Sequence, residues 1–167
     1  MNIFILDKDP IKCAEMHCDK HVVKMIVESC QMLANAFTLD QLKSAPKTIK
    51  GNYRKHSYVN HPCSKWVLES RGNFVWLWDL TQWLIQEYRD RYKKSHSLEK
   101  FVIWVLENNG NINFPKTHRT PFVQAMPDEY KDKDVVKAYR NYYLKEKLIF
   151  AQWKNGNVPS WVRENNK

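Results

Sequence analysis

Hydrophobic residues recur every three to four positions in four parts of the chain, which is the spacing of one buried helix face. The first part runs from Ile11 to Phe37 and predicts a long helix. The second runs from about Cys63 toward Tyr92 and can break at Arg71-Gly72. The third covers residues 97–108, and the last runs from Asp132 or Asp134 to about Phe150. The pattern therefore predicts a mainly helical protein.

Start signals support these helices. Asp9-Pro10 is typical of a cap followed by proline in the first turn. Asn60-His61-Pro62 predicts another helix start, with Asn60 or His61 as the cap and Pro62 in the first turn. Ser97 is a good cap for the third helix, and Asn109-Gly110 is a stop signal after it.

The segments between the helices are long. Residues 38–60 contain Pro46 and Gly51, and residues 110–131 contain three prolines, so neither can be one continuous element. Residues 2–6 form a short apolar stretch that we expect to be extended. The fold class we predict is mainly α, a compact single-domain helical bundle with a short N-terminal extended segment and long loops. Residues 1–167 form one domain, with residues 150–167 packed on the core as a C-terminal strap.

Composition agrees with a globular protein. The chain has 167 residues, of which 43% are hydrophobic and 27% charged, a mixture that excludes a disordered chain. Its apolar runs are too short to span a membrane, and residues 3–6 are too short for a secretory signal. We therefore expect no membrane association and a cytoplasmic protein, located in the host cell if it is viral. The four cysteines contain no C-x-x-C pair and are expected to be reduced thiols.

The chain is basic, with a net charge of +9, and rich in aromatic residues, at 13%. Both features suit a polyanion that carries stacking bases, although a basic helical bundle explains them equally well. No acidic residue lies between Asp40 and Glu69, while this acid-free segment carries six lysines and arginines. We expect the segment to contact phosphates, so that nucleic acid, and more specifically DNA, is the partner.

The early helix holds the first group of candidate catalytic residues. Helical spacing places Cys13, His17, His21, Lys24 and Glu28 on one stripe, with Asp19 and Lys20 beside it. Imidazoles can move protons near neutral pH, and a nearby carboxylate can fix their tautomer. The same stripe could instead hold a metal through His17, His21 and Cys13, or be a solvated face. The catalytic candidates are His17, Asp19, Lys20, His21, Lys24 and Glu28, and we expect no cofactor.

Two other motifs are candidates for DNA contacts. The stretch from Tyr53 to Pro62 combines aromatic, imidazole and cationic side chains directly before a helix N-terminus, which can bind a phosphate. The loop around His118 and Arg119 could read a base edge or a sugar, or serve as a rigid connector. The tryptophans, by contrast, are expected in the core. The nucleic-acid-binding candidates are Lys50, Tyr53, Arg54, Lys55, His56, Asn60, His61, Lys65, His118 and Arg119.

Several motifs together resemble a family of small tailed-phage proteins. They are the stretch from His17 to Met25, the Asn60-His61-Pro62 step and the stretch from Gln124 to Tyr130. This resemblance covers nearly the whole chain but implies no particular activity. The Rossmann and P-loop glycine motifs are absent from the sequence, which disfavours a dinucleotide enzyme or a P-loop nucleotidase.

Residues 1–95 also resemble the pyrimidine-dimer DNA glycosylase (endonuclease V) family in Asn60-His61-Pro62 and in the helix that follows, to Tyr92. The resemblance implies a compact, helical, basic protein with a catalytic carboxylate on an early helix. In that family the nucleophile is the α-amine of a small second residue, exposed when Met is removed. An ordinary α-amine has a pKa near ~8, so part of it is neutral and can attack a sugar C1′.

The second residue here is Asn2, which is bulky enough to disfavour removal of Met1. The Met1 amine could then serve, Lys20 or Lys24 could form the imine, or no covalent step exists. The early carboxylate would be Asp19 or Glu28, and spacing does not decide between them.

The sequence thus predicts a phage-type, DNA-acting enzyme that works on a base or an N-glycosidic bond, like a glycosylase or AP lyase. The alternatives are a non-catalytic nucleic-acid-binding or host-takeover protein and a metal-dependent nuclease. The enzyme hypothesis requires that His17, His21, His61 and His118 gather with the acid-free segment around one groove.

Overall fold

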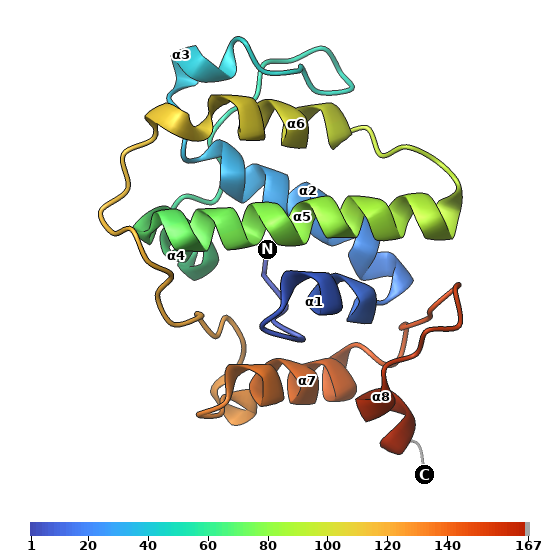
Figure 1. Ribbon diagram of the computed structural model, residues 1–167. Helices are drawn as coiled ribbons and strands as arrows, with labels where there is room; N and C mark the ends of the chain where they lie inside the picture. The colour runs from blue at the N-terminus through green and yellow to red at the C-terminus, as the bar shows by residue number, and fades with distance from the viewer. Residues whose placement is uncertain (166–167) are drawn as a thin grey trace.

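The longest helix, α5 (Arg71–Tyr92), is the centre of the molecule (Figure 1). Helices α1 (Pro10–Met16), α2 (Asp19–Ala34), α4 (Pro62–Glu69) and α6 (Glu99–Asn108) all pack against it. The computed structural model describes residues 1–165, which form no β-strand. The remaining helices are α3 (Leu39–Leu42), α7 (Val135–Glu146), α8 (Ser160–Glu164) and the 3₁₀ turns Asn109–Asn111 and Asp128–Tyr130.

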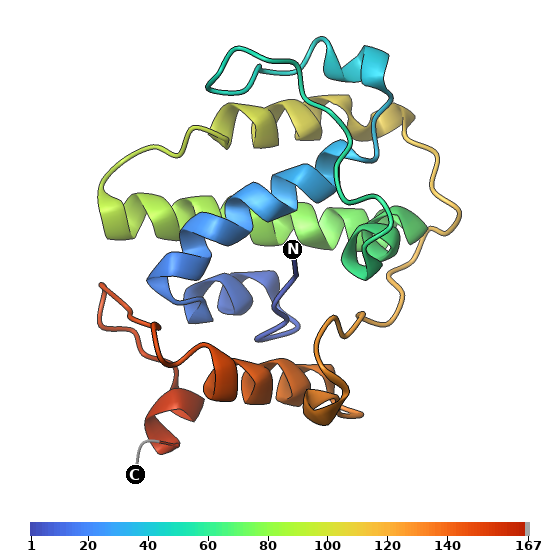
Figure 2. The same ribbon diagram turned by 180° about the vertical axis from the view of Figure 1, so that it is seen from behind.

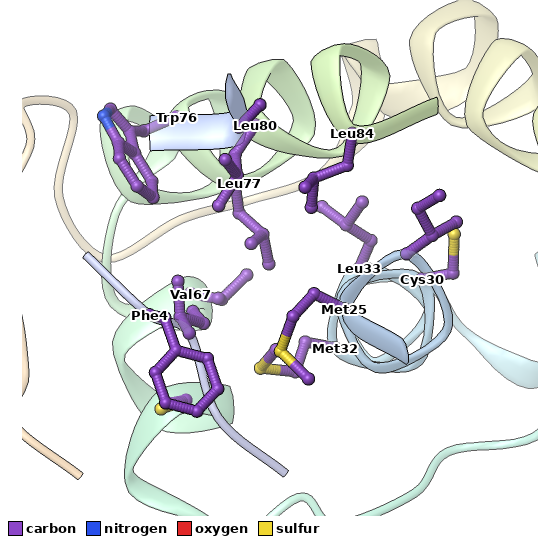
Figure 3. Packing of buried hydrophobic residues seen from close by; sticks show 14 of the residues in the cluster. Phe4, Met25, Cys30, Met32, Leu33, Val67, Trp76, Leu77, Leu80 and Leu84 are labelled. Atoms are coloured by element: carbon purple, nitrogen blue, oxygen red, sulfur yellow. The ribbon is translucent and has the colours of Figure 1, made fainter. Parts of the chain in front are cut away.

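The core lies between α2 and α5, and it confirms the predicted mainly helical fold. Leu77, Leu80 and Leu84 of α5 point toward α2, where Leu33 and Met25 lie opposite (Figure 3). Phe4 of the N-terminal stretch joins the same cluster, as do Trp66, Trp76 and Trp104, whereas Trp83 is 36% exposed. All four cysteines are buried and free.

The long helix predicted for residues 11–37 is wrong, because the chain breaks between α1 and α2. His17 and Cys18 have extended backbones, with ψ angles of 134° and 163°. The amide of Cys18 donates to the Tyr143 hydroxyl at 2.9 Å, and the amide of Asp19 donates to the Gln152 carbonyl at 2.8 Å. Partners more than 120 residues away thus replace the helical hydrogen bonds, which a local pattern cannot predict.

The second predicted helix is likewise divided, but at Ser70 rather than at Arg71-Gly72. Ser70 has an extended backbone and caps α5 by accepting from the Asn73 amide at 3.0 Å. Gly72 is needed for close packing instead of a break, because a Cβ there would lie 2.4 Å from the Arg119 nitrogen.

Other predicted boundaries are close to the observed ones. Asp9 caps α1, and His61 caps α4 with Pro62 in its first turn, as predicted. Helix α6 begins at Glu99, two residues beyond the expected cap, and α7 is capped by Asp134 but ends at Glu146 rather than near Phe150. That residues 1–167 form a single domain stays a prediction.

The predicted C-terminal strap contains a short helix, α8. Trp161 and Val162 of α8 are buried in the same cluster as the other helices. Among the described residues, none of the helices is both long and apolar enough to cross a membrane.

Candidate active site

The carboxylate of Glu28, on α2, contacts the main-chain nitrogens of the first two residues. Its Oε1 lies 3.7 Å from the Met1 nitrogen, and its Oε2 accepts from the Asn2 amide at 2.8 Å. Figure 2 shows the N-terminus beside α2. The side chain of Met1 is 2% exposed, and its sulfur accepts from the Ser64 hydroxyl at 3.7 Å. The burial of this side chain holds the α-amine against the carboxylate.

A second set of contacts holds residue 2 from the opposite side. The Asn2 side-chain amide donates to the Ala125 carbonyl at 2.8 Å. Its Oδ1 accepts from the Ile3 amide at 2.8 Å and lies 3.2 Å from the Tyr139 hydroxyl. Ala125 and Tyr139 are more than 120 residues away in sequence, and Tyr139 also accepts from the Ala125 amide at 3.1 Å. The C-terminal third of the chain therefore fixes the position of the N-terminus.

Two basic side chains complete the site. Lys24 lies one turn before Glu28, with its ammonium 3.5 Å from Oε1, and its side chain is 65% exposed. His61 caps α4 by accepting from the Cys63 amide at its Nδ1, at 3.2 Å, which leaves its ring proton on Nε2. Partial burial lowers the pKa of His61, the chain's N-terminal charge lowers it further, and Glu28 opposes the shift. His61 is therefore a neutral donor at pH 7 beside the amine.

This arrangement brings together an amine, a carboxylate and a neutral imidazole. A carboxylate in contact with an amine can accept its proton and so generate the nucleophilic form. Spacing left Asp19 and Glu28 as alternatives, and the structure places Glu28, not Asp19, at the amine. The clamp on Asn2 had no local sequence signal, because its partners are brought in only by the tertiary fold.

Asp19 lies in a different environment at the start of α2. Its carboxylate contacts the Arg91 guanidinium at 3.1 Å and accepts from the Lys154 amide at 3.0 Å. Arg91 has a fully buried side chain and also binds Glu87 at 2.6 Å and the His17 carbonyl at 2.7 Å. This network ties α2 to α5 and to the C-terminal segment, which is a structural arrangement.

His17 and His21 lie inside the protein and not at the amine. The His17 ring is 0% exposed, with Nδ1 2.7 Å from the Cys13 carbonyl. The His21 ring is 4% exposed and stacks on Phe4 at 4.5 Å between ring centres. Burial lowers the pKa of His17 to about 4 and that of His21 to about 3, the latter helped by the charges of His17 and nearby lysines. Both rings are neutral core residues at pH 7.

The other members of the predicted stripe are also dispersed. The Cys13 thiol donates to the Phe4 carbonyl at 3.2 Å, and burial raises its pKa to about 12. Lys20 lies over the Phe150 ring at 5.0 Å. Within residues 1–165, no group of three or more His, Cys, Asp and Glu side chains is arranged to hold a metal ion. Of the six catalytic candidates, the structure brings Lys24 and Glu28 to the N-terminus.

The acid-free segment forms one wall of a groove of about 1070 Å³ along α2. The segment contributes residues 47–57 to its wall. The opposite wall is made by Val27, Cys30, Gln31 and Ala34 of α2, and residues 97–98 complete the groove. Gln31 lies one helical turn from both Val27 and Glu28, so the groove reaches within about 5 Å, along the helix axis, of the carboxylate's position. The groove and the amine site thus share α2, although none of Met1, Glu28 and His61 lines the groove.

Two of the predicted DNA-binding residues hold the groove wall in place. Arg54 donates to the Pro46 carbonyl at 2.9 Å and packs over the Phe101 ring at 4.1 Å. The His56 ring nitrogen lies 2.7 Å from the Phe37 carbonyl. The remaining groove candidates, Lys50, Tyr53 and Lys55, have exposed side chains that are open to a ligand.

The other predicted DNA-binding residues lie outside the groove. Asn60 and Lys65 are exposed around the start of α4, on either side of His61. His118 and Arg119 are exposed in a loop that packs on the α4–α5 junction, with Arg119 over the Phe122 ring at 4.4 Å. Of the four histidines expected to converge, His61 alone lies with Glu28.

One family of known proteins matches the part of the chain that contains this site. The family described as pyrimidine dimer DNA glycosylase matches residues 1–100, which include Met1, Glu28, His61 and the whole acid-free segment. Comparison with curated proteins found no match, and neither did comparison with solved structures. The resemblance to small tailed-phage proteins stays a prediction. Because the match covers more than half of the chain, the protein belongs to the pyrimidine dimer DNA glycosylase family, a family of enzymes that act on DNA.

Proposed function

We propose that this protein removes a damaged pyrimidine from duplex DNA, with its main-chain α-amine as nucleophile and Glu28 as the proton acceptor. The observation that carries the proposal is the contact of Glu28 with both nitrogens at the start of the chain. Family membership supports DNA as the substrate, and the pyrimidine dimer is the lesion that the family name indicates.

In the proposed reaction the neutral amine attacks C1′ of the damaged nucleotide. The new N–C1′ bond forms as the bond from C1′ to the base breaks, and the base leaves with its electron pair. Glu28 takes the proton that the amine loses, and His61 Nε2–H can donate to the departing base or to the ring oxygen. Opening of the sugar ring gives an imine, and loss of a C2′ proton then expels the 3′ phosphate, which is the lyase step.

The groove beside α2 is the proposed strand-binding surface. Lys50, Lys55 and Lys65 would neutralise phosphates, since exposed lysines are suited to backbone contacts. Tyr53 offers an aromatic ring, and Asn60 and His61 lie just beyond the groove lining, at the start of α4. His118 and Arg119 extend the proposed contact surface along the α4–α5 junction. His17, His21, Asp19 and Lys20 support the fold in this proposal rather than the chemistry.

Either of the first two residues can supply the amine. If Met1 is the first residue of the active protein, its nitrogen lies 3.7 Å from Glu28; if Met1 is removed, the Asn2 nitrogen lies 2.8 Å from the same carboxylate. The intact mass of the purified active protein distinguishes the two.

The proposal is tested by incubating the protein with UV-irradiated and undamaged duplexes and adding borohydride. We expect strand cleavage and a reduced covalent complex on the irradiated duplex, and neither with Glu28→Gln. Asp19→Asn is the matched control, because it alters a carboxylate of the same helix away from the amine. Cleavage without a trapped complex would reject the amine mechanism, and absence of both would reject the function.

We further propose that this activity belongs to a phage and works in the cytoplasm of the infected cell, as the motifs shared with tailed-phage proteins suggest. Expression in a bacterium that lacks repair of pyrimidine dimers should then increase its survival after UV irradiation, and Glu28→Gln should abolish the increase.

A further inference from the structure

A short turn between the groove and the amine site presents an aromatic side chain to solvent. The turn runs from Tyr58 to His61, and the His61 amide donates to the Tyr58 carbonyl at 3.0 Å. Tyr58 is 64% exposed and its neighbour Val59 is 44% exposed, while Asn60 is also exposed. The Tyr58 ring makes none of the aromatic or cation–π contacts found within residues 1–165. Tyr58 and Val59 therefore leave adjacent apolar surface uncovered in the isolated protein.

The backbone of this turn is strained where the ring is attached. Tyr58 has a φ of 51°, a left-handed conformation that is rare for an aromatic residue. Lys93 is the other non-glycine residue with positive φ in the described chain, and its conformation is explained because it ends α5. Tyr58 ends no helix, so its strain has to be maintained by the surrounding contacts.

Those contacts fix the turn to α2 on one side and to α4 on the other. The Ser57 amide donates to the Asn35 side chain at 3.0 Å, and the Asn35 amide group donates to the Ser57 carbonyl at 2.9 Å. On the other side, His61 is fixed as the cap of α4 and faces the charges of Glu28 and the N-terminus. Asn35 and Glu28 are seven residues apart, or about 10 Å along the helix. The turn therefore lies between an anchor on α2, at Asn35, and an anchor at the start of α4, at His61.

We propose that Tyr58 is a wedge that inserts between stacked bases of the duplex beside the target nucleotide and opens the helix for the amine. This inference rests on the proposed function and adds the step that exposes C1′. Proteins that kink DNA insert apolar side chains between base steps, and extraction of a nucleotide requires that its stacking be replaced. The absence of acidic residues between Asp40 and Glu69 lets this turn approach the phosphate backbone without repulsion.

Tyr53 provides the matched comparison, because it is an exposed tyrosine on the same segment. It is 51% exposed, but the Lys47 ammonium lies 4.7 Å from its ring centre and covers one face. Lys47 would have to leave that face before two bases could enclose the ring, so we expect that Tyr53 does not replace Tyr58.

The test uses Tyr58→Gly, since glycine adopts a positive φ without strain and leaves the turn intact. Its melting temperature should be equal to or above that of the unchanged protein. Single-turnover cleavage of a duplex with one thymine dimer should fall about 30-fold, the factor that corresponds to about 2 kcal/mol of lost stacking. Tyr58→Trp should keep the rate, and so should the control Trp83→Ala, which removes a partly exposed aromatic ring of α5 that does not line the groove. On a dimer placed opposite mismatched bases, where the helix is already open, the deficit of Tyr58→Gly should shrink to less than about 3-fold.

A second readout does not require chemistry. A 2-aminopurine base opposite the dimer should brighten when saturating unchanged protein binds and stay dark with Tyr58→Gly. An equal rate deficit on the paired and mismatched duplexes, or fluorescence that does not depend on Tyr58, would overturn the wedge. If the unchanged protein cleaves neither duplex, the proposed function fails, and the fluorescence alone decides the wedge.

Discussion

The two carboxylates of α2 show how the same chemical group acquires two different roles. Asp19 and Glu28 are nine residues apart and each is 8% exposed. Asp19 is held by a fully buried guanidinium and by a main-chain amide, so its charge is used within the fold. Glu28 faces the α-amine and an exposed lysine. Burial alone does not distinguish them; the identity and accessibility of the partners do.

The histidines repeat this contrast. His21 is buried near the start of α2, where its ring packs on Phe4 and Tyr143. The partly exposed His61 instead caps α4 beside the amine. An imidazole without access to solvent or substrate cannot exchange a proton with either, so it contributes to packing.

Glu28→Gln should produce the largest effect on catalysis. We expect the single-turnover rate to fall by about 10² to 10⁴, the range for loss of a general base. The change keeps the shape of the side chain, so the melting temperature should shift by less than about 3 °C. Quenched-flow cleavage and thermal unfolding measure the two quantities. A rate within 10-fold of the unchanged protein would remove Glu28 from the mechanism.

Asp19→Asn should show the opposite pattern. Removing one partner of a buried ion pair leaves Arg91 partly uncompensated, so the free energy of unfolding should fall by about 3 kcal/mol. The rate per folded molecule should stay within about 3-fold. Urea unfolding at pH 7.5 measures the stability. A rate loss as large as that of Glu28→Gln at unchanged stability would show that the two carboxylates share the chemistry.

Acid should destabilise the protein through His17 and His21. Their folded pKa values, about 4 and about 3, lie below the ordinary value of 6.5, so the unfolded chain binds protons first as the pH falls. Their contribution is complete above pH 6.5 and declines as the pH falls toward those folded values. By pH 5 the loss is about 2 kcal/mol for each ring.

Urea unfolding at pH 7.5 and pH 5 measures this loss. The variant with both His17→Gln and His21→Gln is the comparison, because it should be less stable at pH 7.5 and lose less on acidification. An identical pH dependence in both proteins would show that these rings are accessible and titrate normally.

Tyr139→Phe tests the clamp on residue 2 with a smaller expected effect. The hydroxyl accepts from Ala125 and lies beside the Asn2 side chain, so its removal should reduce stability by about 1 kcal/mol. A looser N-terminus should lower the single-turnover rate by about 5-fold, and raised substrate concentration should not restore it. Tyr142→Phe, in the same helix, is the control and should keep the rate.

Lys24→Ala should have the smallest effect. The lysine is mostly exposed, so its ion pair with Glu28 contributes less than about 1 kcal/mol to stability. We expect less than about 5-fold loss of rate and a weaker dependence of DNA binding on salt. Abolished imine trapping in this variant would instead identify Lys24 as the nucleophile.

The sequence predicted most of the helices and the acid-free segment that lines the groove because both depend on local signals. Caps such as Asp9 and His61, the helical spacing of apolar residues and the run without acids are all read within a few positions. The break at His17-Cys18 and the clamp on Asn2 depend on Tyr143, Gln152, Ala125 and Tyr139, all more than 120 residues away. Helical spacing therefore suggested a catalytic stripe. In the structure the break between α1 and α2 interrupts that stripe, and the burial of His17 and His21 removes them from the site.

The most direct test of the account is to locate the covalent bond formed with DNA. The protein is mixed with a duplex containing one thymine dimer, reduced with borohydride and digested, and the modified peptide is sequenced by mass spectrometry. The account predicts one reduced sugar adduct, on the α-nitrogen of the first residue, with none on Glu28→Gln. An adduct on the side chain of Lys20 or Lys24, with the α-nitrogen unmodified, would contradict it.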